Sequence, residues 1–527
     1  MRPRGLAGVA LAVVTVAAAL AAATSGTSPA ARAQGAAAGP PNVVLLMTDD
    51  QTLRDMEVLT RTRALIGGQG VTFTDYRSSY PLCCPARATM LTGQYAHNHK
   101  VLGNVPPHGG YAALDKQHTL PVALASRPRR SYVTTHIGKY LNGYGSKAFR
   151  GKPPGWTNWH GALRAYQMYG YVLNNNGTVR TYGDVHQEDK ALYQTNVYRD
   201  IATNFIRRRA TATDRRPFYL SVAFLAPHAE IYDREGNPAP SVRPDPDDAG
   251  TFATKPLPRG GAFDEADMSD KPDWLRRQIG GPEQRLTAVD IRAITRRYRA
   301  RQESLLAVDR AVAAVVDTLR TTGQLANTYV IFTSDNGFME GQHRVKNGKL
   351  LAYEPAAALP LLMRGPGIPP GRVSAEPTID VDLAPTIMDM AGARPSGWTV
   401  DGRSMLPFAE HPARPRTTRP RLQEIGPQDD TEGDLDQDGA RVPAGEGLKV
   451  PRYKGLTTAR YRYVRYANGQ EELYDMLRDP EQLDNRIDAP RYRAARRVLR
   501  DQLEKLQGCA GDSCRAERPP PPPPPPR

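Results

Sequence analysis

The sequence is poor in cysteine and in aromatic residues. Its 527 residues include four cysteines, too few for a disulfide scaffold, so the core must come from apolar burial. Aromatic residues make up 7% and hydrophobic residues 40% of the chain, and the mean hydropathy is -0.54. These values exclude a membrane protein with many spans, a collagen and a wholly disordered chain. They leave a large globular protein with more than one packing unit.

The sequence also has fewer acidic than basic residues. The chain has 70 Lys and Arg against 55 Asp and Glu, which gives a net charge of +15 and a pI of about 9.6. This excess suits an anionic partner: a nucleic acid, an anionic membrane surface, or an acidic small molecule or glycan. The arginines occur in scattered groups such as 207–209 and 296–297, without interleaved aromatic residues. Nucleic acid is therefore the weaker interpretation, and we expect no nucleic acid partner.

The N-terminal segment has the pattern of an export signal. Arg2 and Arg4 precede an uncharged run rich in Ala, Val and Leu over residues 6–23, and Ala31-Arg32-Ala33 offers a cleavage site. The run is barely long enough to cross a membrane, which favours a signal peptide over residues 1–33 rather than an anchor. Cleavage would leave a net charge of about +12. We therefore predict a secreted, extracellular protein without stable membrane insertion.

The C-terminal segment carries two local features. Residues 519–526 are eight consecutive prolines, which predict an extended polyproline II segment within a solvated tail over 511–527. Cys509 and Cys514 lie close enough in sequence to close a small loop. In an exported chain we expect a disulfide between them.

Short apolar runs alternate with longer amphipathic stretches in the middle of the chain. Residues 42–47, 218–224 and 328–332 have the length and β-branched content of buried strands. Residues 291–319 have helical apolar spacing, with Leu305, Val308, Val312 and Val316 on one stripe. Buried strands separated by helices indicate an α/β sheet with helices on both faces.

The pattern changes after about Pro407. Residues 408–450 are rich in Pro, Gly, Asp and Arg and show almost no apolar periodicity. Residues 461–466 then alternate as a half-exposed strand does, Asn468-Gly469 is a strong hairpin signal, and a return strand begins at Glu472. A helix over 491–506 follows. We predict a catalytic domain over 34–410 and a smaller C-terminal α+β subdomain over 411–510.

Oxygen donors follow two of the predicted strands, at the place where open α/β sheets bind ligands. Asp49 and Asp50 follow the run 42–47, and Asp335 and Asn336 follow the run 328–332. Singly, the first pair fits a helix N-cap with a spare surface acid, and the second fits a simple turn. Together they supply four hard oxygen donors without His or Cys, which favours Ca²⁺ or Mg²⁺ over zinc.

Two adjacent cysteines, Cys83 and Cys84, begin a helix-like segment that contains Arg87. Residue types alone leave three interpretations: a strained disulfide, a thiol nucleophile, or two small buried hydrophobic residues. A helix N-terminus and Arg87 could stabilise a thiolate at Cys83, but this would not name a reaction.

The segment Cys83-x-Pro85-x-Arg87, followed by Leu91-Thr92-Gly93, resembles the signature of the sulfatases, in which the first cysteine is oxidised to formylglycine. The resemblance extends to the segments NVVLLMTDDQ, GKYLNGYG, APH, TSDNG and ELYDMLRDP. The run CCPARATMLTGQYAHNH is most similar to the N-acetylglucosamine-6-sulfatases and the extracellular heparan sulfate endosulfatases. The resemblance implies an alkaline-phosphatase-like α/β fold with a small C-terminal subdomain.

The resemblance also implies a catalytic site, whose residues are assigned by matching each motif of this sequence to the family's motif. One Ca²⁺ ion would be bound by Asp49, Asp50, Asp335, Asn336 and an oxygen of the modified Cys83. Hydrated formylglycine at Cys83 is a geminal diol, one hydroxyl of which attacks sulfur while the second later allows sulfate to be expelled. A formylglycine-generating enzyme would be needed as a partner during maturation.

Four further residues would complete the catalytic set. Arg87 would orient the modified side chain, and Lys139 and Lys349 would hold the sulfate oxygens. His228 would be a sulfate ligand or the acid that protonates the leaving alcohol. Lys346 competes with Lys349 for its role, because the local sequence differs from that of lysosomal relatives.

The chain departs from the family pattern in places. Many arylsulfatases carry a second catalytic histidine two residues after the lysine, where this chain has Leu141 followed by Asn142, so we expect a different proton path. Ala86 replaces the commoner serine of the signature. We expect Cys84 to pack as a buried thiol. His97 and His99 could line the pocket or support it structurally. Residues 238–282 are the least familiar segment, so the leaving sugar stays open.

The leading hypothesis is an exported, Ca²⁺-dependent sulfatase acting on the 6-O-sulfate of N-acetylglucosamine or a related sulfated glycan. The alternatives are a phosphonate or phosphate monoester hydrolase of the same fold, and a catalytically silent glycan-binding protein. The spacing of Asp434, Asp436 and Asp438 opens like an EF-hand, but Gly445 stands in its twelfth place. We expect an acidic surface loop there.

Overall fold

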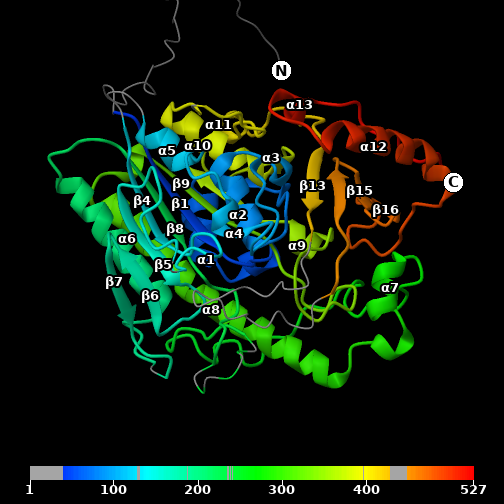
Figure 1. Ribbon diagram of the computed structural model, residues 1–527, viewed down its shortest axis with the longest axis horizontal. Helices are drawn as coiled ribbons and strands as arrows, with labels where there is room; N and C mark the ends of the chain where they lie inside the picture. Colours follow the sequence, from blue (N-terminus) through cyan, green and yellow to red (C-terminus); the bar gives the residue numbers. More distant parts are fainter. Residues whose placement is uncertain are drawn as a thin grey trace, which may run out of the picture. The chain divides into compact units, whose positions relative to one another are not determined.

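The computed structural model describes residues 39–526 apart from 127–130, 147, 187, 234, 236, 238, 240, 396 and 428–447. The predicted export signal and the EF-hand-like spacing at Asp434 lie outside the described residues. Within the described part, no helix combines the length and the apolar character needed to cross a bilayer. Residues from Gly39 onward form one compact unit that contains a large and a small sheet (Figure 1).

Ten of the described strands form one mixed sheet. Its central strands β9, β1, β8, β4 and β5 run parallel to one another, and antiparallel pairs flank them on both sides. In spatial order the strands are β11 (Arg372–Ser374), β2 (Val71–Phe73), β10 (Leu361–Arg364), β9 (Thr328–Ser334), β1 (Asn42–Thr48), β8 (Phe218–Ala223), β4 (Val133–Gly138), β5 (Asn158–Arg164), β6 (Tyr171–Asn175) and β7 (Thr178–Tyr182). The three predicted buried strands are β1, β8 and β9, so this prediction is confirmed.

Helices cover both faces of the large sheet, because successive side chains of a strand point to opposite faces. From β1, Val43 and Leu45 belong to the same apolar cluster as residues of α2, α5 and α10, whereas Val44 and Leu46 cluster with residues of α6 and α8. These helices are α2 (Cys83–Thr92), α5 (Leu120–Ala125), α10 (Leu383–Ala391), α6 (Gln194–Thr211) and α8 (Ala288–Thr321). The predicted α/β sheet with helices on both faces is confirmed.

The remaining elements are short or belong to the C-terminal part. They are α1 (Thr60–Thr62), β3 (Tyr76–Arg77), α3 (Ala96–His99), α4 (Gly110–Ala113), α7 (Asp273–Ile279), α9 (Glu354–Ala357), β12 (Thr378–Ile379), α11 (Leu406–Glu410), β13 (Arg421–Ile425), β14 (Tyr453–Thr457), β15 (Tyr461–Tyr466), β16 (Glu471–Asp475), α12 (Arg493–Leu506) and α13 (Asp512–Arg515). Strands β13 to β16 form an antiparallel sheet, and apolar residues of α12 cluster with residues of β13 to β16. The predicted hairpin and C-terminal helix are confirmed, although the domain boundaries stay a prediction.

Strand β13 was not predicted, because three of its five buried side chains are polar. Arg421, Gln423 and Glu424 are all at most 5% exposed. Arg421 binds Asp75, 346 positions away in the sequence, with Nη1–Oδ1 and Nη2–Oδ2 distances of 2.6 and 3.0 Å. Partners from distant segments allow polar residues into the interior, and such a strand has no apolar alternation to detect.

The prediction of a solvated proline tail holds for six of its eight prolines, which are exposed, but the tail also docks on the small sheet. Pro521 and Pro524 are buried. The carbonyl of Pro519 accepts a hydrogen bond from Gln502 of α12 at 2.7 Å, and that of Pro522 accepts one from Tyr461 of β15 at 2.9 Å. Polyproline II has three residues per turn, so one edge of the segment faces the small sheet and its helix at every third residue. The predicted disulfide between the nearby Cys509 and Cys514 is present.

Asp75 offers a test of how the two sheets are joined. Burial opposes its ionisation, but Arg421 and Arg77 lower the pKa of Asp75 to about 2. A carboxyl whose folded pKa is depressed stabilises the fold above its unfolded pKa of about 3.9 and loses that contribution as the pH falls towards 2. We expect Asp75→Asn to lower the free energy of unfolding by about 2–3 kcal/mol at pH 7, with the difference closing below about pH 4.

Denaturant titrations of both proteins between pH 7 and pH 3 measure this difference. Asp247→Asn is the matched control, because Asp247 pairs with Lys190 at 3.1 Å while both side chains are more than half exposed. We expect a change of less than about 1 kcal/mol there. A loss at Asp75 that does not vary with pH would contradict the charge-based explanation.

Candidate active site

Four parallel strands end level with one another at one edge of the large sheet. Thr48 at the end of β1 is in register with Ser334 at the end of β9. Ala223 at the end of β8 is in register with Met47 of β1 and with Gly138 of β4. The residues that directly follow these strands must therefore lie close together. This is the edge at which the predicted site residues meet.

Asp50 and Asn336 follow β1 and β9 and contact each other. The amide nitrogen Nδ2 of Asn336 donates to Oδ1 of Asp50 at 2.6 Å. The backbone N–H of Asp50 donates to Oδ1 of Asp335 at 3.2 Å. Asp50 has a φ of 63°, an unusual backbone conformation for a residue other than glycine or asparagine, and such strain is concentrated at functional sites. All three side chains are almost completely buried.

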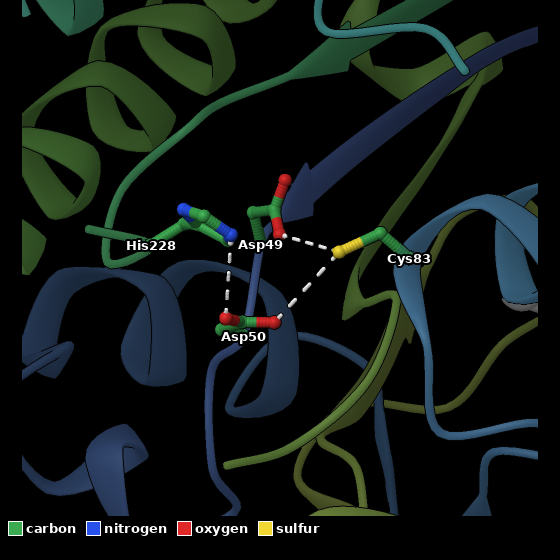
Figure 2. A group of neighbouring side chains, drawn as sticks. All are labelled: Asp49, Asp50, Cys83 and His228. Carbon is green, nitrogen blue, oxygen red and sulfur yellow. Dashed lines mark hydrogen bonds and ion pairs between the residues drawn. The ribbon is translucent and has the colours of Figure 1, made fainter. Parts of the chain in front are cut away.

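Helix α2 brings Cys83 and Arg87 to the same place. Cys83 is the first residue of the helix, and its Sγ lies 3.4 Å from Oδ1 of Asp49 and 4.0 Å from Oδ1 of Asp50 (Figure 2). One turn further, Arg87 joins the two acidic clusters, with Nη2 3.0 Å from Asp49 and Nε 2.7 Å from Asp335. The signature segment is thus anchored on the carboxylates that follow β1 and β9.

The remaining predicted residues complete the cluster. Lys139 follows Gly138, whose φ of 100° and close contact with the carbonyl of β8 leave no room for a side chain. Lys139 Nζ lies 2.6 Å from Oδ2 of Asp49, and His228 Nε2 lies 3.7 Å from Oδ2 of Asp50. Figure 2 shows His228 and Cys83 on opposite sides of the two aspartates.

Lys349, rather than Lys346, belongs to this cluster. Lys349 Nζ lies 2.6 Å from Oδ1 of Asp50 and 2.7 Å from Sγ of Cys83. Lys346 instead pairs with Asp290 at 2.9 Å, and its side chain is 47% exposed. Of the two lysines between which the sequence did not decide, Lys349 therefore lies in the cluster and Lys346 does not.

The cluster contains three carboxylates and three cationic side chains that lie in contact with one another. Burial opposes ionisation of Asp49, but Lys139 and Arg87 hold the pKa of its carboxyl well below the usual range. Burial and the charge of Asp49 raise the pKa of Asp335. Burial and Asp49 also raise the pKa of the Cys83 thiol well above its ordinary value, which disfavours a thiolate nucleophile at this position.

The donor set fits a hard divalent cation. Ligand atoms of Asp49, Asp50, Cys83 and His228 all lie within 4.8 Å of one another. In addition, Oδ1 of Asn336 is buried and has no hydrogen-bond partner among the described residues. A buried acceptor without a donor is costly, and a cation would satisfy it. Carboxylate and amide oxygens are the ligands that Ca²⁺ takes.

Two residues of the site were missed by the sequence reasoning. The ring of Tyr166 lies with its centroid 4.3 Å from Nζ of Lys139 and 5.1 Å from the ring of His228. Arg301 of α8 donates to the backbone carbonyls of Asp50 and Pro227, at 2.6 and 3.2 Å. Tyr166 follows no pattern. Arg301 could have been found as a charged residue four positions before Leu305, on the apolar stripe.

Other named residues lie outside the cluster. Leu141 packs in the core, and Asn142 donates to the hydroxyl of Tyr166 at 2.8 Å. Cys84 is a buried free thiol, as predicted, and burial raises its pKa to about 12. His97 binds Glu424 of β13 at 3.0 Å, and His99 contacts Thr89 at 3.0 Å. Both histidines therefore support neighbouring structure.

Comparisons with known proteins show which proteins this chain is similar to. The human N-acetylglucosamine-6-sulfatase is 36% identical over 385 residues, which cover 71% of this chain and 65% of that protein. The chain thus spans just under two thirds of that relative's length. A protein solved in complex with its substrate D-glucosamine-2-N,6-O-disulfate superposes with a TM-score of 0.67 at 21% identity, covering 90% of this chain and 98% of that one.

The fold is shared more widely than the reaction. The phosphonate monoester hydrolase of Agrobacterium radiobacter superposes with a TM-score of 0.64 at 22% identity, covering 89% of this chain and 95% of that one. The predicted alkaline-phosphatase-like α/β fold with a small C-terminal sheet is confirmed. The sulfatase family model matches residues 41–393. Because this match spans well over half of the sequence, the chain belongs to the sulfatase family.

Proposed function

We propose that the protein is an exported, Ca²⁺-dependent sulfatase that hydrolyses the 6-O-sulfate of N-acetylglucosamine or of a related sulfated glycan, with formylglycine at Cys83. The observation that carries this proposal is the convergence, at one sheet edge, of Cys83 with three carboxylates and three cations. An Asp-rich edge is suited to a cation, and buried cations beside it are suited to a sulfate. The family and the human relative's name support the reaction and the sugar.

The calcium ion would be held by Asp49, Asp50, Asp335, Asn336 and an oxygen of the modified Cys83. When bound, the ion supplies Lewis acidity, which favours ionisation of a coordinated hydroxyl and offsets the charge of the carboxylates. With the carboxylates neutralised in this way, Lys139 and Lys349 become available to a substrate anion. Arg87 keeps both of its carboxylate partners and orients the residue at position 83.

The proposed reaction uses the chain's own groups in sequence. One hydroxyl of hydrated formylglycine at position 83 loses its proton and attacks sulfur, the S–O bond to the sugar breaks, and His228, which we assign as the acid, protonates the leaving alcohol. Lys139 and Lys349 stabilise the sulfate oxygens as charge develops. The second hydroxyl then loses its proton, the C–O bond to sulfate breaks as the carbonyl re-forms, and one water molecule hydrates the aldehyde back to the diol. Leu141 is buried in the core, so the proton path of arylsulfatases with a second histidine is not used.

Substrate assays test the reaction and the sugar together. We expect sulfate release from a small aryl sulfate and from N-acetylglucosamine 6-sulfate, with much lower rates on the matched aryl phosphate and phosphonate. Preference for the phosphorus esters would favour the phosphonate hydrolase alternative. Binding of the sugar sulfate without turnover, in protein whose Cys83 is fully converted, would favour the silent glycan-binding alternative.

The two neighbouring lysines provide a matched pair of variants. We expect Lys349→Ala to lower kcat by about 10²–10³-fold, because a preorganised cation beside the reacting group is removed. Lys346→Ala should leave kcat within about twofold, since that side chain pairs with Asp290 at the surface. Initial rates on the aryl sulfate measure both. Equal effects of the two substitutions would contradict the assignment.

Maturation and export stay part of the proposal. Conversion of Cys83 requires a formylglycine-generating enzyme acting on the chain before it is folded, because the residue is fully buried in the folded protein. The predicted signal peptide over residues 1–33 would direct the chain out of the cell. N-terminal sequencing of protein recovered from the medium measures the cleavage site.

A further inference from the structure

A second group of cations lies away from the catalytic cluster. A groove of about 440 Å³ is lined by α3, by the strands β13, β14 and β15, and by the residue that follows α12. Lys100, Arg452, Lys454 and Arg465 line it, and Glu424 is the one carboxylate among its described lining residues. We call this the basic groove. None of the nine proposed site residues lines it, and its volume lies within the range of about 300–1,000 Å³ that is typical of ligand pockets.

The carboxylate that lines the basic groove does not neutralise the positive charge of its four cationic side chains. Glu424 is already engaged by His97 at 3.0 Å and by Lys454 at 3.5 Å. In the described part of the chain, neither Lys100 nor Arg452 has an ion-pair partner, and both residues are exposed. A concave surface with unpaired cations attracts anionic groups, and a guanidinium can bind a sulfate or carboxylate through two hydrogen bonds.

The lining of the basic groove also offers apolar surface. Leu102, Tyr453 and Tyr466 line it beside the cations, and the rings of the two tyrosines pack edge to face with centroids 5.6 Å apart. A ligand suited to this lining has anionic substituents on a body with apolar faces. Sulfated or carboxylated sugar units have this chemistry.

Residues that line the basic groove form hydrogen bonds with the segment that contains Lys349 and with the segment that precedes Cys83. The hydroxyl of Tyr453 donates to the backbone carbonyl of Leu350 at 2.9 Å, and Leu350 directly follows Lys349. The backbone N–H of Gly426 donates to the hydroxyl of Tyr80 at 2.8 Å, three residues before Cys83. A polymer bound at Cys83 therefore has a second cationic surface close to the catalytic segments.

We propose that the basic groove is a second binding site for the glycan, which holds anionic sugar units of the same chain whose sulfate is hydrolysed at Cys83. This inference rests on the proposed function and deepens it, because it makes the substrate a polyanionic chain rather than a single sugar. The groove contributes to affinity for that chain and takes no part in the chemical step.

Binding is measured without turnover, in the Cys83→Ala background. The probe is a fluorescently labelled glycosaminoglycan octasaccharide that carries several sulfates, and fluorescence anisotropy gives its Kd. We expect Lys100→Gln combined with Arg452→Gln to raise the Kd about tenfold or more and to flatten its dependence on salt. The matched control is Arg208→Gln combined with Arg372→Gln, which removes the same charge from exposed positions elsewhere.

Turnover separates the groove from the catalytic site. With Cys83 intact, we expect the groove variant to lower kcat/KM about tenfold for the octasaccharide and to leave the small aryl sulfate unchanged. Equal Kd values for the groove and control variants would overturn the proposal, as would a parallel loss on both substrates. If wild-type protein releases no sulfate but the groove variant still loses octasaccharide binding, the proposed function fails while the binding site stands.

One competing occupant is part of the chain. Residues 429–446 follow Pro427 in the sequence and contain seven Asp and Glu. A variant in which residues 428–447 are replaced by a Gly and Ser linker of equal length tests them. Octasaccharide binding at the groove that appears only in this variant would overturn the proposal in favour of an internal anion. Binding by the parent chain that depends on Lys100 and Arg452 supports it.

Discussion

Replacing Cys83 with alanine is expected to abolish sulfate release, with kcat lowered at least about 10⁴-fold. The side chain is completely buried and lies within 4 Å of carboxylate oxygens of Asp49 and Asp50 and of Nζ of Lys349. No other described nucleophile occupies that position between the carboxylates and the cations. Loss of a covalent nucleophile leaves only the binding and electrostatic contributions to catalysis.

The adjacent cysteine supplies the control. Cys84 packs in the core, and its backbone N–H donates to Oδ1 of Asn104 at 3.1 Å, a bond that alanine preserves. We expect Cys84→Ala to cost about 1 kcal/mol of stability and to keep kcat within about threefold. Mass spectrometry of the peptide that contains both cysteines should show the loss of sulfur at Cys83 and an unchanged Cys84. An active protein with unmodified Cys83 would contradict the proposed mechanism.

Removal of calcium is expected to reduce activity by at least about 10³-fold, and addition of Ca²⁺ should restore it. A ligand that binds only the folded state stabilises it by about 2.7 kcal/mol at a concentration 100 times its Kd, so the melting temperature should rise with Ca²⁺. Asp335→Asn should abolish that rise, because it removes a charged ligand and one of the two carboxylate partners of Arg87. Elemental analysis of wild-type protein should give one ion per chain.

A buried aspartate elsewhere separates metal binding from general destabilisation. Asp309 of α8 accepts hydrogen bonds from the backbone N–H groups of Arg61 and Thr62 at 3.0 and 2.7 Å. Asp309→Asn should lower the melting temperature while the stabilisation by Ca²⁺ persists. If both aspartate variants respond to Ca²⁺ like the wild type, the oxygen cluster after β1 and β9 is not the metal site.

Part of the site was predictable because strand ends are marked locally. A continuous apolar run predicts a buried strand, and parallel strands bring their carboxyl ends to one edge, so Asp49 and Asp335 could be expected to meet. Cys83 and Arg87 carry a signature that one segment contains completely. Lys139, His228 and Lys349 came from the resemblance alone, since an isolated lysine or histidine has no local pattern that marks it.

The small sheet shows the limit of local patterns most clearly. Strands β15 and β16 were predicted from alternation and from the turn at Asn468-Gly469, which act between near neighbours. Strand β13 was not, because Arg421 and Glu424 are buried against Asp75 and His97, more than 300 positions away. The docking of the proline tail was not predicted for the same reason, since the carbonyls of Pro519 and Pro522 accept hydrogen bonds from the distant residues Gln502 and Tyr461.

The sequence by itself determined the absence of a disulfide scaffold, the alternation of buried strands with helices, the oxygen donors at two strand ends and the signature at Cys83. The tertiary structure decided that Lys349 rather than Lys346 reaches the cluster, that Arg301 and Tyr166 support it, and that cations gather in the basic groove. The physical reason is the range of the forces involved. Apolar periodicity and turns depend on neighbouring residues, whereas the partner of a buried charge is set by the path of the whole chain.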